Sequence, residues 1–353
     1  MTESFDQAAV EAWLAPRLGA DSVVMLDAKR PSGQGFSAET VMFTAEARRG
    51  GESSHERLVL RLENPEPAIY PAQSSEDLAE IEIQHRVMTA IASHGTVPVA
   101  PVVGYEAEAS VAGKPFFVMR FVEGQVPIES PLYTQEGFFT EATPEQRHRL
   151  ISSGIEAMAA IHRVDWQAAG LQWLVPEGGT PGNHAQLDLW ERFGLEELRG
   201  RRHPVLEQAW EWLHRELPAD DTPGLCWGDP RPGNIIFRDF EPACLTDFEA
   251  SYVGPAELDL GWWLMFDRTT HPDDTRLEGD PDRDEQRRIY FEASGRTPID
   301  TTPHEIFAAA RYCVIVVRVM NRWEQRGDLP AEHTIWLENP ASAALSTMLA
   351  ELG

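Results

Sequence analysis

The spacing of hydrophobic and polar residues divides the chain into a strand-rich first third and a helix-rich remainder. Residues 6–18 carry apolar side chains at near-helical spacing, which predicts a first helix. Short apolar stretches separated by turn-forming sequences predict strands at residues 23–26, 40–45, 57–62, 102–107 and 115–121. A second helix is expected among them, capped by Ser74 or Ser75 and running to about Ser93.

The chain changes character after Gly124, because helical periodicity then dominates. Helices are predicted at residues 144–163, 185–198, 204–216, 304–324 and 341–352, with a strand-and-turn stretch at 224–253. Together these elements predict an α+β fold. A small N-terminal lobe is expected at residues 1–122, a connector near 120–124, and a larger, mostly helical C-terminal lobe at 123–353. A nucleotide site would lie in the cleft between the lobes.

Composition and charge restrict the partners of this protein. A length of 353 residues suits two lobes better than one simple core. The formal net charge of −27 argues against nucleic acid and anionic membranes as partners, because binding either requires a cationic face. Cys226, Cys244 and Cys313 are scattered without a CxxC pair, as expected in a reducing cytosol. No signal peptide is visible at the start of the sequence, so a cytoplasmic protein is expected.

The most informative segment runs from Leu225 to Glu249. Asp229 is followed five positions later by Asn234 and then by an apolar strand, which returns to Asp247. A hairpin would therefore bring these three side chains toward one point. Phosphoryl transfer needs such a cluster, since Mg²⁺ prefers oxygen ligands and a separate carboxylate must accept the proton of the attacking hydroxyl.

This segment resembles the aminoglycoside phosphotransferase family and, through it, the protein kinases, whose catalytic loops share the spacing Asp-x-x-x-x-Asn. The resemblance implies a kinase-like two-lobe fold with an antiparallel sheet and one main helix in the N-terminal lobe. It implies that Asp229 is the catalytic base and that Asn234 and Asp247 are Mg²⁺ ligands. Arg231 would contact the γ-phosphate, and Asp259 would brace the loop. Trp227 stands where the family motif has histidine.

The first third of the chain carries weaker resemblances. Gly33, Gly35 and Ser37 match the family's phosphate-covering turn, in which glycine lets backbone N–H groups approach phosphate oxygens. Arg61 occupies the place of a phosphate-binding lysine, and a guanidinium can also clamp phosphate. Its partner on the next helix is open among three positions, Glu80, Glu82 and Gln84, of which the last stands where the family has glutamate.

Residues 113–124 resemble the strand and connector that bind adenine. By that match the carbonyl of Arg120 and the N–H of Val122 would contact the base edge. The expected nucleotide is ATP, with GTP as the open alternative, and the expected metal is Mg²⁺. Oligomeric state is not predicted.

The sequence therefore predicts an ATP- and Mg²⁺-dependent phosphotransferase that acts on a hydroxyl of a small molecule. The acceptor is open among aminoglycosides, amino alcohols and hydroxy acids or hydroxyacyl compounds, and several motif variants resemble the branch associated with acyl-CoA dehydrogenases. A nucleotide-binding pseudoenzyme or scaffold is the alternative. The acid-rich stretch 267–285 is either a solvated surface loop or a mobile rim of the acceptor pocket.

Overall fold

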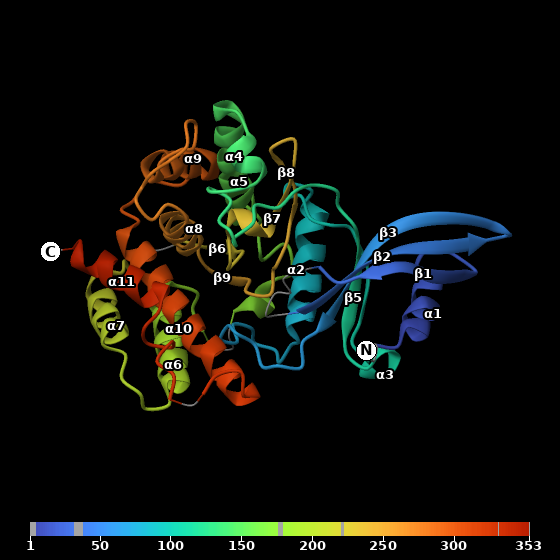
Figure 1. Cartoon of the computed structure of the whole chain (residues 1–353), viewed down its shortest axis with the longest axis horizontal. Helices are drawn as coiled ribbons and strands as arrows, with labels where there is room; N and C mark the ends of the chain where they lie inside the picture. The colour runs from blue at the N-terminus through green and yellow to red at the C-terminus, as the bar shows by residue number, and fades with distance from the viewer. Residues whose placement is uncertain (1–4, 32–37, 176–178, 220–221, 331, 353) are drawn as a thin grey trace.

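A five-stranded antiparallel sheet fills the first third of the computed structural model, which describes residues 5–31, 38–175, 179–219, 222–330 and 332–352. The strand order is β1-β2-β3-β5-β4. The strands are β1 (Ser22–Lys29), β2 (Ala38–Arg49), β3 (Glu52–Glu63), β4 (Val102–Glu106) and β5 (Phe116–Arg120). Figure 1 shows this sheet at one end of the molecule and most of the helices at the other. The predicted α+β class is confirmed.

The hairpin of β2 and β3 is longer than the sequence predicted. Its register runs from Ala38 opposite Glu63 to Arg49 opposite Glu52, so polar residues beyond the apolar stretches stay in the ladder. The turn falls on Gly50 and Gly51, whose φ angles of 55° and 91° suit glycine. The long hairpin carries Arg61 on β3 beside β5.

The helix α2 (Glu80–His94) begins four or five residues later than predicted. The expected caps Ser74 and Ser75 do not lie at its start, and its N-cap residue makes no side-chain capping bond. Instead, the carboxylate of Glu63 accepts hydrogen bonds from the backbone N–H of Glu80 (3.4 Å) and Ile81 (3.1 Å). A distant acid on β3 therefore supplies the cap, which sequence spacing alone could not reveal.

Helices dominate the rest of the chain (Figure 1). The longer ones are α1 (Gln7–Arg17), α5 (Pro144–His162), α6 (Asn183–Leu198), α7 (Pro204–Glu216), α8 (Glu257–Thr270), α9 (Arg283–Ser294), α10 (Thr302–Arg326) and α11 (Pro340–Ala350). Short helical turns are α3 (Ala109–Ala112), α4 (Phe138–Glu141), η1 (Gln172–Leu174) and η2 (Pro232–Asn234). The helix α9 was not predicted, because its apolar positions are few among charged ones.

Two short antiparallel strand pairs carry the loops that contain Asp229 and Asp247. One joins β6 (Pro223–Cys226) to β9 (Tyr252–Pro255), and the other joins β7 (Ile235–Arg238) to β8 (Glu241–Leu245). The loop that holds Asp229 leaves β6, and the turn that holds Asp247 leaves β8. The hairpin expected from the sequence is thus present as β7 and β8, while β9 pairs with β6.

Two hydrophobic clusters support these elements. The first extends from the sheet through α2 to α5 and the central hairpins. The second lies among α6, α7, α8, α10 and α11, and it includes Ile69 from the segment between β3 and α2. A segment of the first third therefore packs into the helical part. Among the described residues, no helix is long and apolar enough to span a membrane.

Candidate active site

Asp229 is buried and receives four hydrogen-bond donors. Trp262 Nε1 on α8 lies 2.8 Å from Oδ1, and Asn234 Nδ2 lies 2.9 Å from Oδ2. Arg231 Nε lies 3.2 Å from each carboxylate oxygen, and Tyr70 Oη lies 3.5 Å from Oδ2. The side chain is 9% exposed. These contacts fix the orientation of the carboxylate.

The backbone before Asp229 is held from several sides. Asp259, fully buried at the start of α8, accepts hydrogen bonds from the N–H of Trp227 (2.6 Å) and of Gly228 (3.1 Å) and also bonds His162. Gly228 has a φ of 94°, and a Cβ there would lie 2.1 Å from the carbonyl oxygen of Ala250. Only glycine fits this close approach. Asp259 thus holds the backbone of the loop, and His162 holds Asp259 in turn.

Trp227, which replaces the family's histidine, is completely buried. Its Nε1 donates to the carbonyl oxygen of Thr246 (2.8 Å), one residue before Asp247. Its ring packs at a tilt against Phe248. The tryptophan therefore ties the Asp229 loop to the Asp247 turn, so the loop keeps a fixed geometry without the histidine.

The structure brings Arg61 and Asp247 into contact from opposite parts of the chain. Arg61 Nη2 lies 3.1 Å from Asp247 Oδ1 and 3.3 Å from Gln84 Oε1. Gln84 is therefore the α2 residue that binds Arg61 directly. Glu82 instead accepts a hydrogen bond from Tyr105 (2.9 Å). Burial, together with the charges of Glu249 and Glu63, raises the pKa of Glu80 to about 8, so this carboxyl is mostly protonated at neutral pH.

The oxygen atoms of Asp247 and Asn234 fit a magnesium ion that takes few of its ligands from protein. Asn234 donates from its amide nitrogen to Asp229, so the side-chain carbonyl oxygen of Asn234 is available to a metal ion. Asp247, whose side chain is 31% exposed, adds a carboxylate. Within the described ranges, no cluster of three or more His, Cys, Asp or Glu side chains could hold a metal. Mg²⁺ commonly takes one or two protein ligands and completes its shell with water and phosphate, so the pair suits it.

A cavity of about 360 Å³ opens between the sheet and the central hairpins. It is lined by Arg61, Gln84, Asp247, Arg120 and Val122, which the sequence had placed around a nucleotide. Apolar side chains that include Met88, Met119 and Ile236 form its walls. The remaining predicted nucleotide residues, Gly33, Gly35 and Ser37, lie outside the described residues.

Arg231 lies beside Asp229 but also has a second partner. It forms an ion pair with Glu129 in the segment after the connector, and its guanidinium carbon lies 5.3 Å from the centre of the Phe266 ring. Although burial opposes its charge, Asp229 and Glu129 raise the pKa of Arg231. Arg231 is thus a fixed cation at the edge of the site.

Sequence reasoning missed three residues that contact this centre: Tyr70, Glu129 and Trp262. Trp262 lies on α8, and only the packing of this helix shows that its side chain reaches Asp229. Tyr70 lies 159 positions before Asp229 in a proline-rich segment with no catalytic motif. Burial and the charges of Asp229 and Glu249 raise the pKa of Tyr70 far above its usual range, so the phenol stays neutral.

The acid-rich stretch 267–285 is partly folded into the protein. Asp267 and Asp280 are buried, and His271 Nε2 lies 2.8 Å from Asp280 Oδ2. Arg276 Nη1 donates to Asp267 Oδ1 at 3.0 Å. Asp273 and Asp274 remain exposed. The charge of the stretch is therefore partly compensated by the buried His271 and by Arg276, and the stretch is not uniformly solvated.

The His271 network predicts a pH-dependent stability. Burial opposes charge on the ring, but the hydrogen bond to Asp280 and the charges of Asp267 and Asp280 raise its pKa. The stabilisation is therefore complete below about pH 6.5, the unfolded value, and is lost as pH rises through the folded pKa. His271→Gln should lower the unfolding free energy by about 3 kcal/mol near pH 6, the scale of breaking a buried ion pair.

Urea unfolding between pH 5.5 and 8 measures this effect, with His55→Gln on the exposed end of β3 as the control. The difference in unfolding free energy between wild type and His271→Gln should become smaller as the pH rises. A difference that stays constant across this range would contradict a charged His271.

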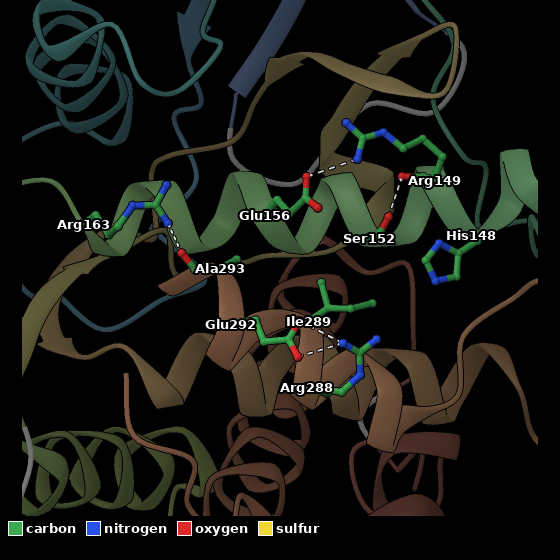
Figure 2. Close-up of a pocket in the computed structure, with 9 residues that line it drawn as sticks. All are labelled: His148, Arg149, Ser152, Glu156, Arg163, Arg288, Ile289, Glu292 and Ala293. Carbon is green, nitrogen blue, oxygen red and sulfur yellow. Dashed lines mark hydrogen bonds and ion pairs between the residues drawn. The ribbon is translucent and has the colours of Figure 1, made fainter. Parts of the chain in front are cut away.

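A separate hollow of about 640 Å³ lies between α5 and α9. Figure 2 shows charged side chains along it, with Arg288 directed at Glu292 and Arg163 at the carbonyl of Ala293. The residues that line it include none of the predicted site residues. Its arginines are occupied by partners of the protein itself, so it contributes nothing to the site around Asp229.

Comparison with known proteins agrees with the fold. A family model described as "Phosphotransferase enzyme family" (APH) matches residues 29–298. The structure resembles that of a Ralstonia eutropha JMP134 protein assigned to the aminoglycoside phosphotransferases. The TM-score is 0.68, and the identity is 25% over 98% of this chain and 96% of that chain. It also resembles a thermostable mutant of aminoglycoside phosphotransferase APH(4)-Ia in a ternary complex with AMP-PNP and hygromycin B. There the TM-score is 0.59, with 12% identity over 98% of this chain and 99% of that chain.

Curated relatives point to a particular branch. "Probable acyl-CoA dehydrogenase IBR3" of Arabidopsis thaliana is 29% identical over 61% of this chain and 26% of its own length. "Acyl-CoA dehydrogenase family member 11" of Homo sapiens is 24% identical over 74% of this chain and 31% of its own length. The chain spans less than a third of either relative.

The fold is the kinase-like two-lobe architecture of the aminoglycoside phosphotransferases. The chain belongs to the phosphotransferase enzyme family whose model covers residues 29–298. The family and fold predicted from the sequence are both confirmed.

Proposed function

We propose that this protein transfers the γ-phosphate of ATP, bound with Mg²⁺, to a hydroxyl of a small molecule. The observation that carries the proposal is a chain of contacts that ends in the cavity between the sheet and the central hairpins. Asn234 donates to Asp229, and the backbone carbonyl of Asn234 accepts from Thr246. Asp247, the next residue, contacts Arg61, and both line the cavity. A base, two oxygen ligands and a phosphate-binding cation are the parts that phosphoryl transfer requires. The AMP-PNP bound by a structural neighbour supports a nucleotide in such a fold.

Each residue has a proposed role. Asp229, held by Trp262 and Asn234, orients the acceptor hydroxyl and accepts its proton. Asn234 and Asp247 would hold Mg²⁺, which supplies charge neutralisation at the phosphates. Arg61 binds phosphate oxygens from the side of the sheet, and Arg231 faces the γ-phosphate from the catalytic loop.

The nucleotide is proposed to lie with its base near Arg120 and Val122, which both line the cavity. The carbonyl of the first and the N–H of the second would contact the base edge. Gly33, Gly35 and Ser37 are proposed to cover the phosphates. GTP stays open as an alternative phosphate donor. The division into lobes at residues 1–122 and 123–353, with a hinge at 120–124, stays a prediction. A cytoplasmic location also stays a prediction.

A panel of acceptors tests the activity. ADP release in the presence of Mg-ATP is measured with aminoglycosides, amino alcohols, hydroxy acids and hydroxyacyl thioesters, and the product is identified by mass. Phosphorylation of one class supports the proposal. Mg-ATP binding without transfer to any class would favour the scaffold alternative instead.

Arg61 offers a prediction on nucleotide binding. Arg61→Ala should weaken Mg-ATP binding by about 1.5–3 kcal/mol, the scale of a hydrogen bond to a charged group. Arg61→Lys should recover part of the loss, because it keeps the charge without the planar fork. Calorimetric titration measures both variants, with Arg48→Ala on the exposed end of β2 as the control. An unchanged dissociation constant for Arg61→Ala would remove Arg61 from the nucleotide site.

A further inference from the structure

The carboxylate of Asp229 has no free position for an acceptor. A carboxylate offers about four lone-pair positions. Trp262, Asn234, Arg231 and Tyr70 already approach them, at 2.8, 2.9, 3.2 and 3.5 Å. An acceptor hydroxyl that gives its proton to Asp229 can therefore bind only after one of these four donors has moved away.

Tyr70 is the donor best suited to leave. Its contact is the longest of the four, and the residue is less buried than Trp262 and Asn234. Trp262 and Asn234 are buried, with 2% and 3% exposure, and Arg231 is held by Glu129 as well. Tyr70 is also the neutral O–H donor of the set, so it has the chemistry of an alcohol acceptor.

The segment that carries Tyr70 is fixed on both sides. We call residues 64–79, between β3 and α2, the strap. Ile69 packs into the helical core, and Arg318 Nε donates to the carbonyl of Ala68 at 3.0 Å. Further along, Gln186 donates to Gln73 at 2.8 Å. These anchors hold the backbone on both sides of Tyr70, whereas the Tyr70 side chain can change its rotamer.

Space for a second position of the ring lies beside it. Tyr70 lines a cavity of about 360 Å³ whose other walls include Ser74, Leu78, Leu174 and Ser251. The tyrosine therefore stands between this cavity and Asp229. Rotation of the ring into the cavity would vacate the position beside Oδ2 without unfolding the strap.

We infer that the Tyr70 hydroxyl occupies the acceptor-hydroxyl position at Asp229 and acts as a gate. This inference rests on the proposed function of Asp229. In the resting protein the phenol fills the position and keeps water from the base, so ATP is hydrolysed only slowly. An acceptor with enough binding energy displaces the phenol and places its own hydroxyl there.

Hydrolysis of ATP without an acceptor tests the gate, with water as the probe. Tyr70→Phe removes the hydroxyl but keeps the ring, so water gains the vacant position. Its rate of hydrolysis should exceed that of wild type by about three- to tenfold, the factor that one neutral hydrogen bond contributes. Tyr105→Phe is the matched control, because that hydroxyl binds Glu82 in the sheet region, and its rate should equal that of wild type.

Other outcomes would overturn the gate. A Tyr70→Phe rate equal to or below that of wild type, in protein that binds Mg-ATP, would make Tyr70 a residue that positions Asp229 or does nothing. A gain of one phosphoryl group on Tyr70, seen by intact mass after incubation with Mg-ATP, would make it an acceptor and not a gate. Tyr70→Leu repeats the measurement if the phenylalanine variant does not fold.

Failure of the proposed function gives a different result. In that case wild type either does not bind Mg-ATP in a calorimetric titration or binds it without transfer to any acceptor of the panel. If both proteins bind Mg-ATP, wild type phosphorylates an acceptor and only the difference in hydrolysis is missing, the gate fails and the phosphotransferase proposal is unaffected.

Discussion

Asp229→Asn is expected to lower kcat by about 100-fold or more, the usual scale for loss of a general base. Asparagine keeps the size of the side chain, and its carbonyl oxygen can still accept from Trp262, so the fold should persist. It cannot take the proton of the acceptor hydroxyl. Because Asp229 lies apart from the residues that line the nucleotide cavity, the KM for ATP should change little.

The measurement is steady-state phosphorylation of the acceptor found in the panel, with Asp188→Asn on the exposed surface of α6 as the control. Thermal unfolding confirms that both variants are folded. A kcat for Asp229→Asn within a few-fold of wild type would remove Asp229 from the proton transfer.

Asp247→Ala is expected to abolish binding of Mg-ATP in a calorimetric titration. Asp247 is the one carboxylate of the proposed metal pair, and its loss leaves the carbonyl of Asn234 alone with the ion. It also frees Arg61, which lies 3.1 Å from Asp247 Oδ1. Metal-free ATP should therefore bind the variant no more weakly than it binds wild type.

Backbone conformation must be separated from metal binding at this position. Asp247 has a φ of 58°, a left-handed conformation that alanine adopts at a cost and that asparagine tolerates. Asp247→Asn is therefore the matched variant, since it keeps the backbone and loses the charge. Mg²⁺-dependent binding that survives in Asp247→Asn at wild-type strength would show that Asp247 is structural.

The stretch 267–285 shows where composition alone is a poor guide. The sequence left open a solvated loop or a mobile acidic rim. The structure buries Asp267 and Asp280 against Arg276 and His271, and α9 begins within the stretch. Charges that are counted as acidic in a sequence can be paired inside the fold, so they say little about the charge of an acceptor.

Local patterns were sufficient for the parts of the protein whose partners are close in sequence. The five-residue step from Asp229 to Asn234 and the hairpin to Asp247 could be read directly, because a short loop and a tight return fix where their side chains lie. Periodicity also predicted α1, α5 and α10, whose apolar faces repeat at helical spacing. The family and the fold followed from these motifs.

Contacts between distant segments were decided by the tertiary structure alone. The start of α2 depends on Glu63, and the partner of Arg61 among three candidates depends on which face of α2 meets the sheet. The approach of Tyr70 to Asp229 joins residues 159 positions apart. No local propensity encodes such contacts, because they arise only when the strap packs into the helical core and carries its tyrosine to the catalytic loop.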